Sequence, residues 1–238
     1  MKDFIRKFLP SGGIAVGAAL ALAALSACTD YVAQMEGDFE AWASLQGDEI
    51  PLSTTKPSSS ASVYVATGSM LDDRDGQIYK TVTIGSQTWM AQNLNYAHPD
   101  SSYCYDNVVA NCNTYGRLYT WYAAIEACPS GWHLPSLEEY QTLFETVGGS
   151  DAAKKKLKST SGWSGGANGT DDYGFTVLPA GSHFYFSSDM GEESLLWTTS
   201  QTTYGDVNYV YFIQFSSAGL WDISSYRNKA NSVRCLLN

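Results

Sequence analysis

Apolar residues at helical spacing mark one segment near the middle of the chain. They fall three or four residues apart, as on one face of an α-helix, at Leu137, Tyr140, Leu143, Phe144 and Val147. Just ahead of them, Ser136 and Glu139 have the spacing of a capping box, which satisfies free backbone N–H groups at a helix start. The glycine pair at 148–149 supplies a C-terminal stop. The pattern predicts a helix over residues 137–147.

Two more segments are predicted to be helical. Residues 117–126 place four large apolar side chains on one face, namely Leu118, Trp121, Tyr122 and Ile125. Residues 151–158 form a shorter helix with a basic run at Lys154, Lys155, Lys156 and Lys158. We interpret this run as a solvated face of the helix and not as a phosphate site.

Apolar alternation predicts strands in most of the remainder. Ile78, Val82 and Ile84 fall on alternate positions, residues 85–86 fit a two-residue hairpin turn, and the return strand over 87–90 carries Trp89 as a core residue. Later strands are predicted over 174–179, 195–200, 209–215, 220–225 and 232–237. The run 209–215 is apolar on both faces, as in a central strand, and 216–219 reads as a hairpin loop. The pattern predicts an α+β fold, with two to three helices packed on short, mostly antiparallel strands.

Charge and composition exclude some classes of partner. The 238 residues include 14 basic and 24 acidic side chains, a net charge of −10. A nucleic-acid-binding protein needs a basic face, and anionic lipid surfaces attract basic segments, so neither partner is expected. Seven tryptophans and 16 tyrosines, with few charged residues, favour an extracytoplasmic, β-rich domain.

The first 28 residues indicate the cellular address. Lys2, Arg6 and Lys7 precede an apolar core over 14–25 that is too short to span a bilayer. The following Leu25-Ser-Ala-Cys28 resembles a bacterial lipobox. That resemblance implies a signal peptide over 1–27 and a lipid on Cys28, which would attach the protein to the membrane. The alternative is an ordinary secretory signal that ends near residue 27.

The residues after the lipobox indicate the final location and the domain boundary. Thr29, in place of Asp, permits transfer to the outer membrane under the sorting rule of enteric bacteria. We therefore expect a lipid-anchored protein of the bacterial cell envelope. Residues 28–69 are acidic and then rich in serine and proline, which predicts a tether. The folded domain is assigned to residues 70–238.

Four cysteines remain besides Cys28, an even number that suits disulfides outside the cytoplasm. They allow three pairings. We choose Cys104–Cys112, which closes a short loop, and Cys128–Cys235, which ties the start of the capped helix to the last predicted strand. The domain is thus predicted to be stapled by disulfides.

Acidic clusters raise the question of a metal or an active site. Residues 72–76 and 168–172 contain Asp and Asn at short spacing, but neither matches an EF-hand loop, so structural turns are the better interpretation. Calcium is therefore unsupported and no cofactor is predicted. His98, His133 and His183 are scattered, with His133 expected in the core, and no motif of a hydrolase, metalloprotease or nucleotide-binding loop is present.

Six motifs in a fixed order resemble the Fibrobacter succinogenes major paralogous domain over residues 70–238. Their ranges are 75–85, 87–94, 115–121, 128–136, 169–175 and 232–235; the fourth reads Cys128-Pro-Ser-Gly-Trp-His-Leu-Pro-Ser136. The resemblance implies a secreted or lipid-anchored bacterial protein. It also implies a C-type-lectin-like fold, shared with formylglycine-generating enzymes, in which Cys128 pairs with Cys235.

The leading functional hypothesis is a surface-anchored binding or adhesion module, with carbohydrate as the candidate ligand. Candidate ligand-binding residues are Trp197, Trp221, Asp222 and Tyr226, whose alternative role is core packing. The calcium-dependent sugar motifs of C-type lectins are absent. A second hypothesis is a structural or protein-interaction component of an envelope assembly. A third is an enzyme of formylglycine-generating-like fold, although that chemistry needs a reactive cysteine pair and only Cys235 aligns with it.

Overall fold

The computed structural model describes residues 63–99, 101–204 and 207–238. The signal peptide, Cys28 and most of the tether lie outside this part of the chain. Within it, no helix is both long and apolar enough to cross a membrane. The described residues belong to one compact unit.

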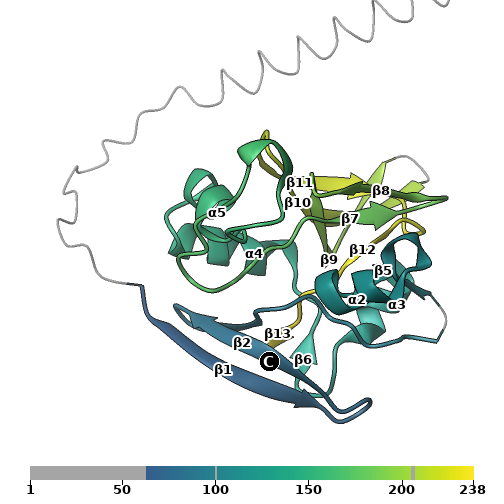
Figure 1. Ribbon diagram of the computed structural model, residues 1–238, viewed down its shortest axis with the longest axis horizontal. Helices are drawn as coiled ribbons and strands as arrows, with labels where there is room; N and C mark the ends of the chain where they lie inside the picture. The colour runs from purple at the N-terminus through teal and green to yellow at the C-terminus, as the bar shows by residue number, and fades with distance from the viewer. Residues whose placement is uncertain (1–62, 100, 205–206) are drawn as a thin grey trace, which may run out of the picture. The chain divides into compact units, whose positions relative to one another are not determined.

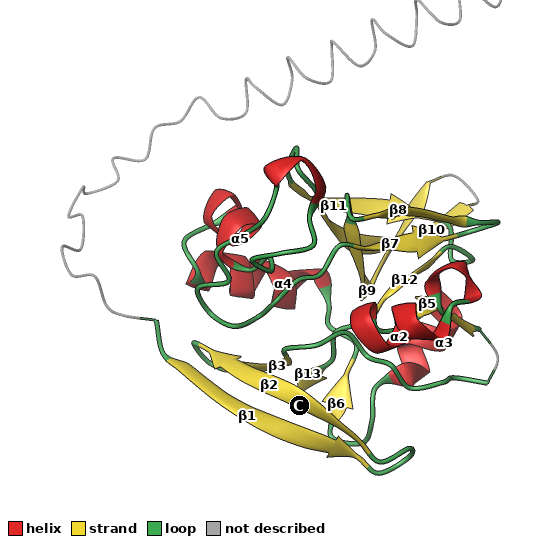
Figure 2. Ribbon diagram, in the orientation of Figure 1, coloured by secondary structure: helices red, strands yellow, loops and turns green. Residues whose placement is uncertain are grey.

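The fold is α+β, as expected (Figure 1, Figure 2). The described residues contain four α-helices, more than the two to three predicted: α2 (Val109–Tyr115), α3 (Trp121–Ala127), α4 (Leu137–Thr146) and α5 (Ser150–Lys156). Two short 3-10 helices are η2 (Tyr105–Asn107) and η3 (Ser164–Gly166). Helix α2 went unpredicted because residues 104–112 read as a polar loop.

A five-stranded antiparallel sheet contains both ends of the described domain. Its order is β1-β2-β3-β13-β6, with bounds Val65–Asp72, Gln77–Ile84, Gln87–Met90, Leu236–Leu237 and Trp132–His133. The predicted two-residue turn is confirmed, since Ile84 pairs with Gln87 across residues 85–86. Strand β1 takes in residues 65–69, which the sequence analysis placed in the tether.

The second sheet is built mainly from the C-terminal half of the domain. Its order is β11-β10-β9-β7-β12-β5-β4, and β8 pairs with β7. The bounds are β4 Ser102–Tyr103, β5 Leu118–Thr120, β7 Ala180–His183, β8 Ser187–Met190, β9 Ser194–Tyr204, β10 Val207–Phe215, β11 Leu220–Ser225 and β12 Ala230–Ser232. Strand β10 is flanked on both sides, which confirms its predicted central place. Among the described strands of this sheet, the short β7–β9 and β12–β9 pairings are parallel and the other pairings are antiparallel.

The capped helix is confirmed in detail. The Ser136 Oγ accepts from the Glu139 backbone N–H at 3.2 Å, and the Glu139 carboxylate accepts from the Ser136 N–H at 2.7 Å. At the other end, the Gly149 N–H donates to the Phe144 carbonyl. The buried face of α4 packs on Trp89, whose ring centroid lies 4.9 Å from that of Tyr140. The capping residues and the core contacts therefore both favour a helix at the position of α4.

The two predicted disulfides are both present. Cys104 and Cys112 have their Cα atoms 4.9 Å apart, and Cys128 and Cys235 have theirs 5.8 Å apart. The second bond joins the loop before β6 to the segment before β13. It therefore fixes β6 and β13, which pair with each other, by a covalent bond between the segments that precede them.

A buried arginine, to which the sequence analysis assigned no role, holds the same region from within. Arg234 is fully buried; its Nε donates to the Asn93 Oδ1 at 2.7 Å, and its Nη2 donates to the Thr176 carbonyl at 2.6 Å. The other guanidinium nitrogen donates to the carbonyls of Met90 and Phe175. Burial lowers the pKa of Arg234 to about 10. These bonds link three segments that are far apart in sequence, so Arg234 serves the fold.

Tertiary context overturns several element predictions. The helix predicted over 117–126 is divided between strand β5 and helix α3, and its expected buried face is wrong because Tyr122 and Ile125 are exposed. Residues 174–179 are irregular, although Phe175 and Val177 are buried. The last predicted strand is divided into β12 and β13.

Two single-residue predictions also fail. Lys158 does not belong to a solvated face: it is 3% exposed, and its Nζ donates to the Ser216 carbonyl at 3.3 Å. Ile78 is 70% exposed, because the buried face of β2 changes along the strand from Tyr79 to Val82 and Ile84. A prediction from sequence periodicity assumes that each strand buries one face. That assumption fails for β2, because its two faces contact core residues at different points along the strand.

Candidate functional site

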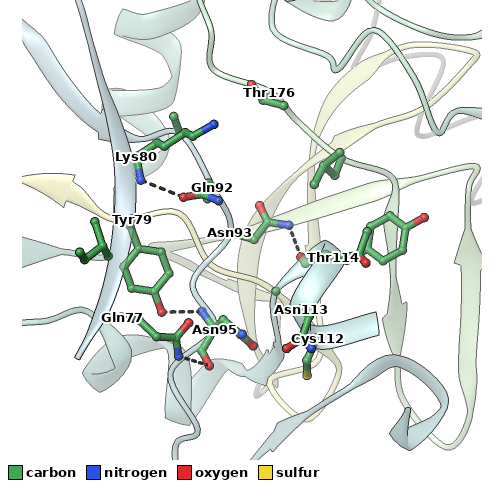
Figure 3. Close-up of a pocket in the computed structure, with 15 residues that line it drawn as sticks. Gln77, Tyr79, Lys80, Gln92, Asn93, Asn95, Cys112, Asn113, Thr114 and Thr176 are labelled. Atoms are coloured by element: carbon green, nitrogen blue, oxygen red, sulfur yellow. Dashed lines mark hydrogen bonds between the residues drawn. The ribbon is translucent and has the colours of Figure 1, made fainter. Parts of the chain in front are cut away.

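A polar cavity of about 210 Å³ lies between β2, the segment 91–95 and α2. Figure 3 shows Tyr79 and Gln92 on one side of it and Asn113 and Thr114 on the other. Lys80 is its charged lining residue, and amide side chains are frequent. Such a lining is suited to hydrogen-bond a small polar ligand.

Most of the amides in this cavity already serve the fold. The Gln92 Oε1 accepts from the Lys80 backbone N–H at 2.8 Å, and the Asn95 backbone N–H donates to the Tyr79 hydroxyl at 3.0 Å. The Asn93 amide donates to the Tyr115 carbonyl. Because these groups hold the 91–95 segment between β2 and α2, the cavity is better explained as a structural junction than as a ligand site.

The predicted ligand-binding residues do not form one site. Trp197 is fully buried and its Nε1 donates to the Tyr119 carbonyl at 2.6 Å, so its assignment as a ligand-binding residue was wrong. Its position on β9, between two other strands, explains this burial. Trp221 and Asp222 are exposed on the edge strand β11 and line a small hollow of about 150 Å³. Tyr226 lines a different hollow.

That different hollow is a shallow groove of about 340 Å³, which we call the tyrosine groove. It is lined by Tyr122, Asn208, Tyr226, Arg227 and Asn228. The two tyrosines are 62% and 57% exposed, so their rings are open to a ligand. The lining comes from α3, from β10 and from the turn between β11 and β12.

Helix α3 is held against this turn by its first residue. The Trp121 backbone N–H donates to the Arg227 carbonyl at 3.0 Å, and the Trp121 indole donates to the Thr198 carbonyl at 2.9 Å. The buried positions of α3 are otherwise alanines, whose small side chains let the helix approach its neighbours closely. With Trp121 and the alanines on the buried side, Tyr122 is directed toward solvent.

The other tyrosine is positioned by an aromatic neighbour. The rings of Tyr226 and Tyr209 lie 5.4 Å apart, centroid to centroid, and are tilted by 41°. A hydrogen bond with Tyr226 raises the pKa of Tyr209. Arg227 is also fixed: its guanidinium lies 4.9 Å from the Trp121 ring centre, and its Nη2 donates to the Gln201 Oε1. The groove is thus preorganised by contacts among its own surrounding residues.

This arrangement suits a polyhydroxylated ligand. Tyrosine rings offer an apolar face together with a polar tip. Asn208 and Asn228 add amide donors and acceptors beside those rings. Sequence reasoning found Tyr226 but missed Tyr122, Asn208, Arg227 and Asn228. The available signal was the polar run at 226–228 between two strands, where loop residues carry binding groups.

The predicted acidic turns are confirmed as structural. The Asp171 carboxylate accepts from the Thr176 backbone N–H and hydroxyl, both at 2.7 Å, and Asp72 accepts from Arg74 at 2.7 Å. Across the described ranges, no three His, Cys, Asp or Glu residues gather as a metal site would require.

The histidines are engaged separately. His133 lies at the surface and not in the core, with its ring nitrogens 2.9 Å from the Glu139 carboxylate and 2.6 Å from the Asn238 Oδ1. His183 stacks on Tyr103, with ring centroids 4.8 Å apart.

The Fibrobacter succinogenes major domain matches residues 82–236 of this chain. The chain belongs to this family. No curated protein and no solved structure matches it. The family match contains every residue of the tyrosine groove and both disulfides, whereas β1 lies ahead of it.

Proposed function

We propose that this member of the Fibrobacter succinogenes major domain family is a lipid-anchored cell-envelope module that binds carbohydrate through the tyrosine groove. The observation that carries the proposal is the exposure of Tyr122 and Tyr226 in one groove beside Asn208 and Asn228. The proposal contains no catalytic step, metal or cofactor.

The groove is a better carbohydrate site than the polar cavity for a physical reason. Sugar rings have apolar C–H faces and hydroxyl edges, so they need an exposed aromatic face and free polar groups together. The groove supplies both, whereas the cavity is lined by a Tyr79 that is 3% exposed and by the side chains of Gln92 and Asn93, which are already hydrogen-bonded to the protein. Because its walls come from three elements fixed by hydrogen bonds, the groove has little ordering entropy to lose on binding.

The anchoring part of the proposal rests on residues 1–28. The lipobox-like Leu25-Ser-Ala-Cys28 supports cleavage before Cys28 and attachment of a lipid to it. Thr29 supports delivery to the outer membrane. A serine- and proline-rich stretch between Cys28 and β1 would then act as a tether that keeps the groove accessible to an extended polysaccharide.

We also propose that the fold is C-type-lectin-like. Two features support it: a Trp132-His-Leu-Pro135 turn that leads into the capped helix α4, and a disulfide from Cys128, four residues before that turn, to Cys235 next to the last strand β13. Fold alone does not imply function, so the carbohydrate proposal stands on the groove and not on this likeness.

The test is a binding screen of the whole chain, held in a non-glycosidic detergent, against plant cell-wall and bacterial polysaccharides, with and without calcium. Tyr122→Ala and Tyr226→Ala are each expected to weaken binding about tenfold, a loss near 1.4 kcal/mol. Tyr185→Ala is the matched control, because Tyr185 is a tyrosine that is even more exposed, at 81%, and lies outside the groove.

Two results would contradict the proposal. One is the absence of binding to every glycan tested. The other is binding that survives both groove substitutions but is lost in Trp221→Ala, which would place the site at the β11 hollow instead. Binding that does not change when calcium is removed is the expected outcome, since the groove contains no carboxylate.

A second candidate function, a protein-interaction component of an envelope assembly, is favoured by one other surface. Phe184, Tyr185 and Phe186 form the tip of the β7–β8 hairpin and are 40%, 81% and 74% exposed. Three adjacent exposed aromatics are typical of a contact surface. A Phe184→Ser/Phe186→Ser double variant that no longer sediments with the native envelope complexes, yet binds glycan normally, would favour this function.

A further inference from the structure

The tyrosine groove contains one formal charge in its lining, and that charge is positive. Arg227 is the charged member of a lining otherwise made of tyrosines and asparagines. The chain as a whole carries a net charge of −10. A cation inside the groove of so acidic a protein gives the groove a local potential opposite to that of its surroundings.

Arg227 has no carboxylate partner in the part of the chain that the structure describes. The ion pairs found there join Arg74 to Asp72 and His133 to Glu139. Glu126 lies one helical turn after Tyr122 on α3, yet it neither lines the groove nor pairs with Arg227. Among the residues that the structure describes, no carboxylate therefore neutralises this positive charge.

The guanidinium is held in place by groups that do not remove its charge. It lies 4.9 Å from the Trp121 ring centre and 5.8 Å from the Tyr122 ring centre, distances at which a cation is attracted to an aromatic face. Its Nη2 donates to the neutral Gln201 side chain. The charge is thus positioned beside Tyr122 before any ligand arrives.

We propose that the tyrosine groove selects acidic polysaccharides, whose sugar units carry a carboxylate, over neutral ones. This inference rests on the proposed carbohydrate function. A sugar ring packs on Tyr122 or Tyr226, and the carboxylate of that unit or the next accepts a charge-assisted hydrogen bond from Arg227. Such bonds are stronger than those between neutral groups, and guanidinium matches carboxylate geometry well.

The experiment compares polygalacturonate with its fully methyl-esterified form, which keeps the same chain of sugars but removes the negative charge. Binding to the whole chain in non-glycosidic detergent is measured by calorimetry at low and high sodium chloride. The acid form is expected to bind about tenfold tighter at low salt, near the lower end of what a hydrogen bond to a charged group contributes. Added salt is expected to reduce that preference, because the groove is open to solvent.

Three substitutions assign the preference to Arg227. Arg227→Gln is expected to bind both forms equally, at the affinity of the wild type for the ester. Arg227→Lys, which keeps the charge but loses the planar fork and its stacking, is expected to retain part of the preference. Lys155→Gln removes one exposed positive charge from α5 and is expected to leave the preference unchanged. Circular dichroism and the thermal midpoint confirm that each variant is folded.

The possible failures are distinguishable. If the wild type binds both forms equally, or if Arg227→Gln keeps the full preference for the acid form, the inference is wrong and the carbohydrate function stands. If neither form binds but neutral glycans do, the inference is again wrong and the function stands. If no glycan binds at all, the proposed function fails together with the inference.

Discussion

The Lys158 ammonium lies 4.0 Å from the centre of the Trp163 ring and donates to the Ser216 carbonyl, in a site where both side chains are buried. No described carboxylate forms an ion pair with it. Burial, and secondarily the charge of Lys154, lowers the pKa of Lys158. Keeping Lys158 charged in the folded state therefore costs free energy.

Replacing the charge should stabilise the protein at neutral pH. In Lys158→Met the side chain keeps its length and its packing on Trp163 but loses the buried charge. The free energy of unfolding is expected to rise by on the order of 1 kcal/mol, measured by urea denaturation at pH 7.

The gain should disappear in alkali. The pKa of Lys158 is lowered in the folded protein, so between that lowered value and the ordinary value of 10.5 the unfolded chain holds more protons than the folded chain. Over that range of pH, this lysine makes the stability of the wild type rise with pH. The variant lacks that rise, and the two curves should converge near pH 10.5. A Lys158→Met protein that is less stable at every pH would show that the cation–π contact outweighs burial.

Buried tyrosines should set the alkaline limit of stability. Burial raises the pKa of Tyr79 to about 12 and raises that of Tyr140 above its ordinary value of 10.0. Above pH 10, tyrosines in the unfolded chain lose protons first, so stability falls as the pH rises through the folded pKa values. Tyr140→Phe should reduce this fall. Its effect at pH 7 should be near zero, because the Tyr140 hydroxyl has no hydrogen-bond partner among the described residues.

Tyr79→Phe is the control for that prediction. The Tyr79 hydroxyl accepts from the Asn95 N–H, so this variant should lose about 1 kcal/mol at pH 7. Equal losses in both variants at neutral pH would contradict the assignment of Tyr140 as an unbonded hydroxyl. Urea denaturation at pH 7 and pH 11 measures both effects.

The two disulfides should differ in their contribution to stability. Cys128–Cys235 closes a loop of 107 residues, and Cys104–Cys112 closes one of 8. In the chain-entropy treatment, the first bond stabilises by about 4.8 kcal/mol and the second by about 2.5 kcal/mol. The Cys128→Ala/Cys235→Ala double variant should therefore unfold at a clearly lower denaturant concentration than Cys104→Ala/Cys112→Ala. The reverse order would indicate that the short loop, with helix α2, dominates the stability.

Replacing a glycine that is crowded by its neighbours should destabilise the protein more than replacing a glycine with open space around it. Gly116 and Gly131 both have positive φ, at 78° and 82°. A Cβ at Gly116 would lie 2.6 Å from the Asn93 Cβ, whereas nothing lies within 4 Å at Gly131. Gly131→Ala should cost about 1 kcal/mol for its backbone conformation alone. Gly116→Ala should destabilise the protein by about 2 kcal/mol more than Gly131→Ala, because of overpacking. Similar thermal midpoints of the two variants would contradict this.

Lipid attachment can be tested directly. Cys28→Ala should abolish labelling with a radioactive fatty acid and release the protein from the membrane fraction, since the lipid would be its attachment to the bilayer. The Cys104→Ala/Cys112→Ala variant is the matched cysteine control and should label normally. Labelling that persists in Cys28→Ala would disprove the lipobox assignment.

Local physics explains which elements were predictable. The α4 cap depends on Ser136 and Glu139, which are three residues apart, and the 85–86 turn needs only a glycine and its neighbours. Both features are decided within a few residues, so the sequence alone contains the necessary information. The residues from 117 to 126 contain no such signal. They are divided into β5 and α3 because residues 118–120 pair with β12, more than a hundred residues later.

The tyrosine groove shows the same limit at the level of the site. Tyr226 is recognisable in sequence as an aromatic residue next to a turn, but nothing in sequence brings it to Tyr122 or turns Tyr122 outward. Those outcomes depend on the bond between the Trp121 N–H and the Arg227 carbonyl, and on alanines filling the buried side of α3.

The sequence by itself determined the α+β class, the capped helix, the central strand and the family, and the family resemblance implied the Cys128–Cys235 disulfide. Tertiary structure alone decided that Trp197 and Lys158 are buried, that Arg234 links three distant segments, and that Arg227 lines a groove together with two tyrosines. The reason is physical: periodicity and caps act over a single helical turn or strand, whereas burial and groove formation depend on contacts between residues that the chain separates widely.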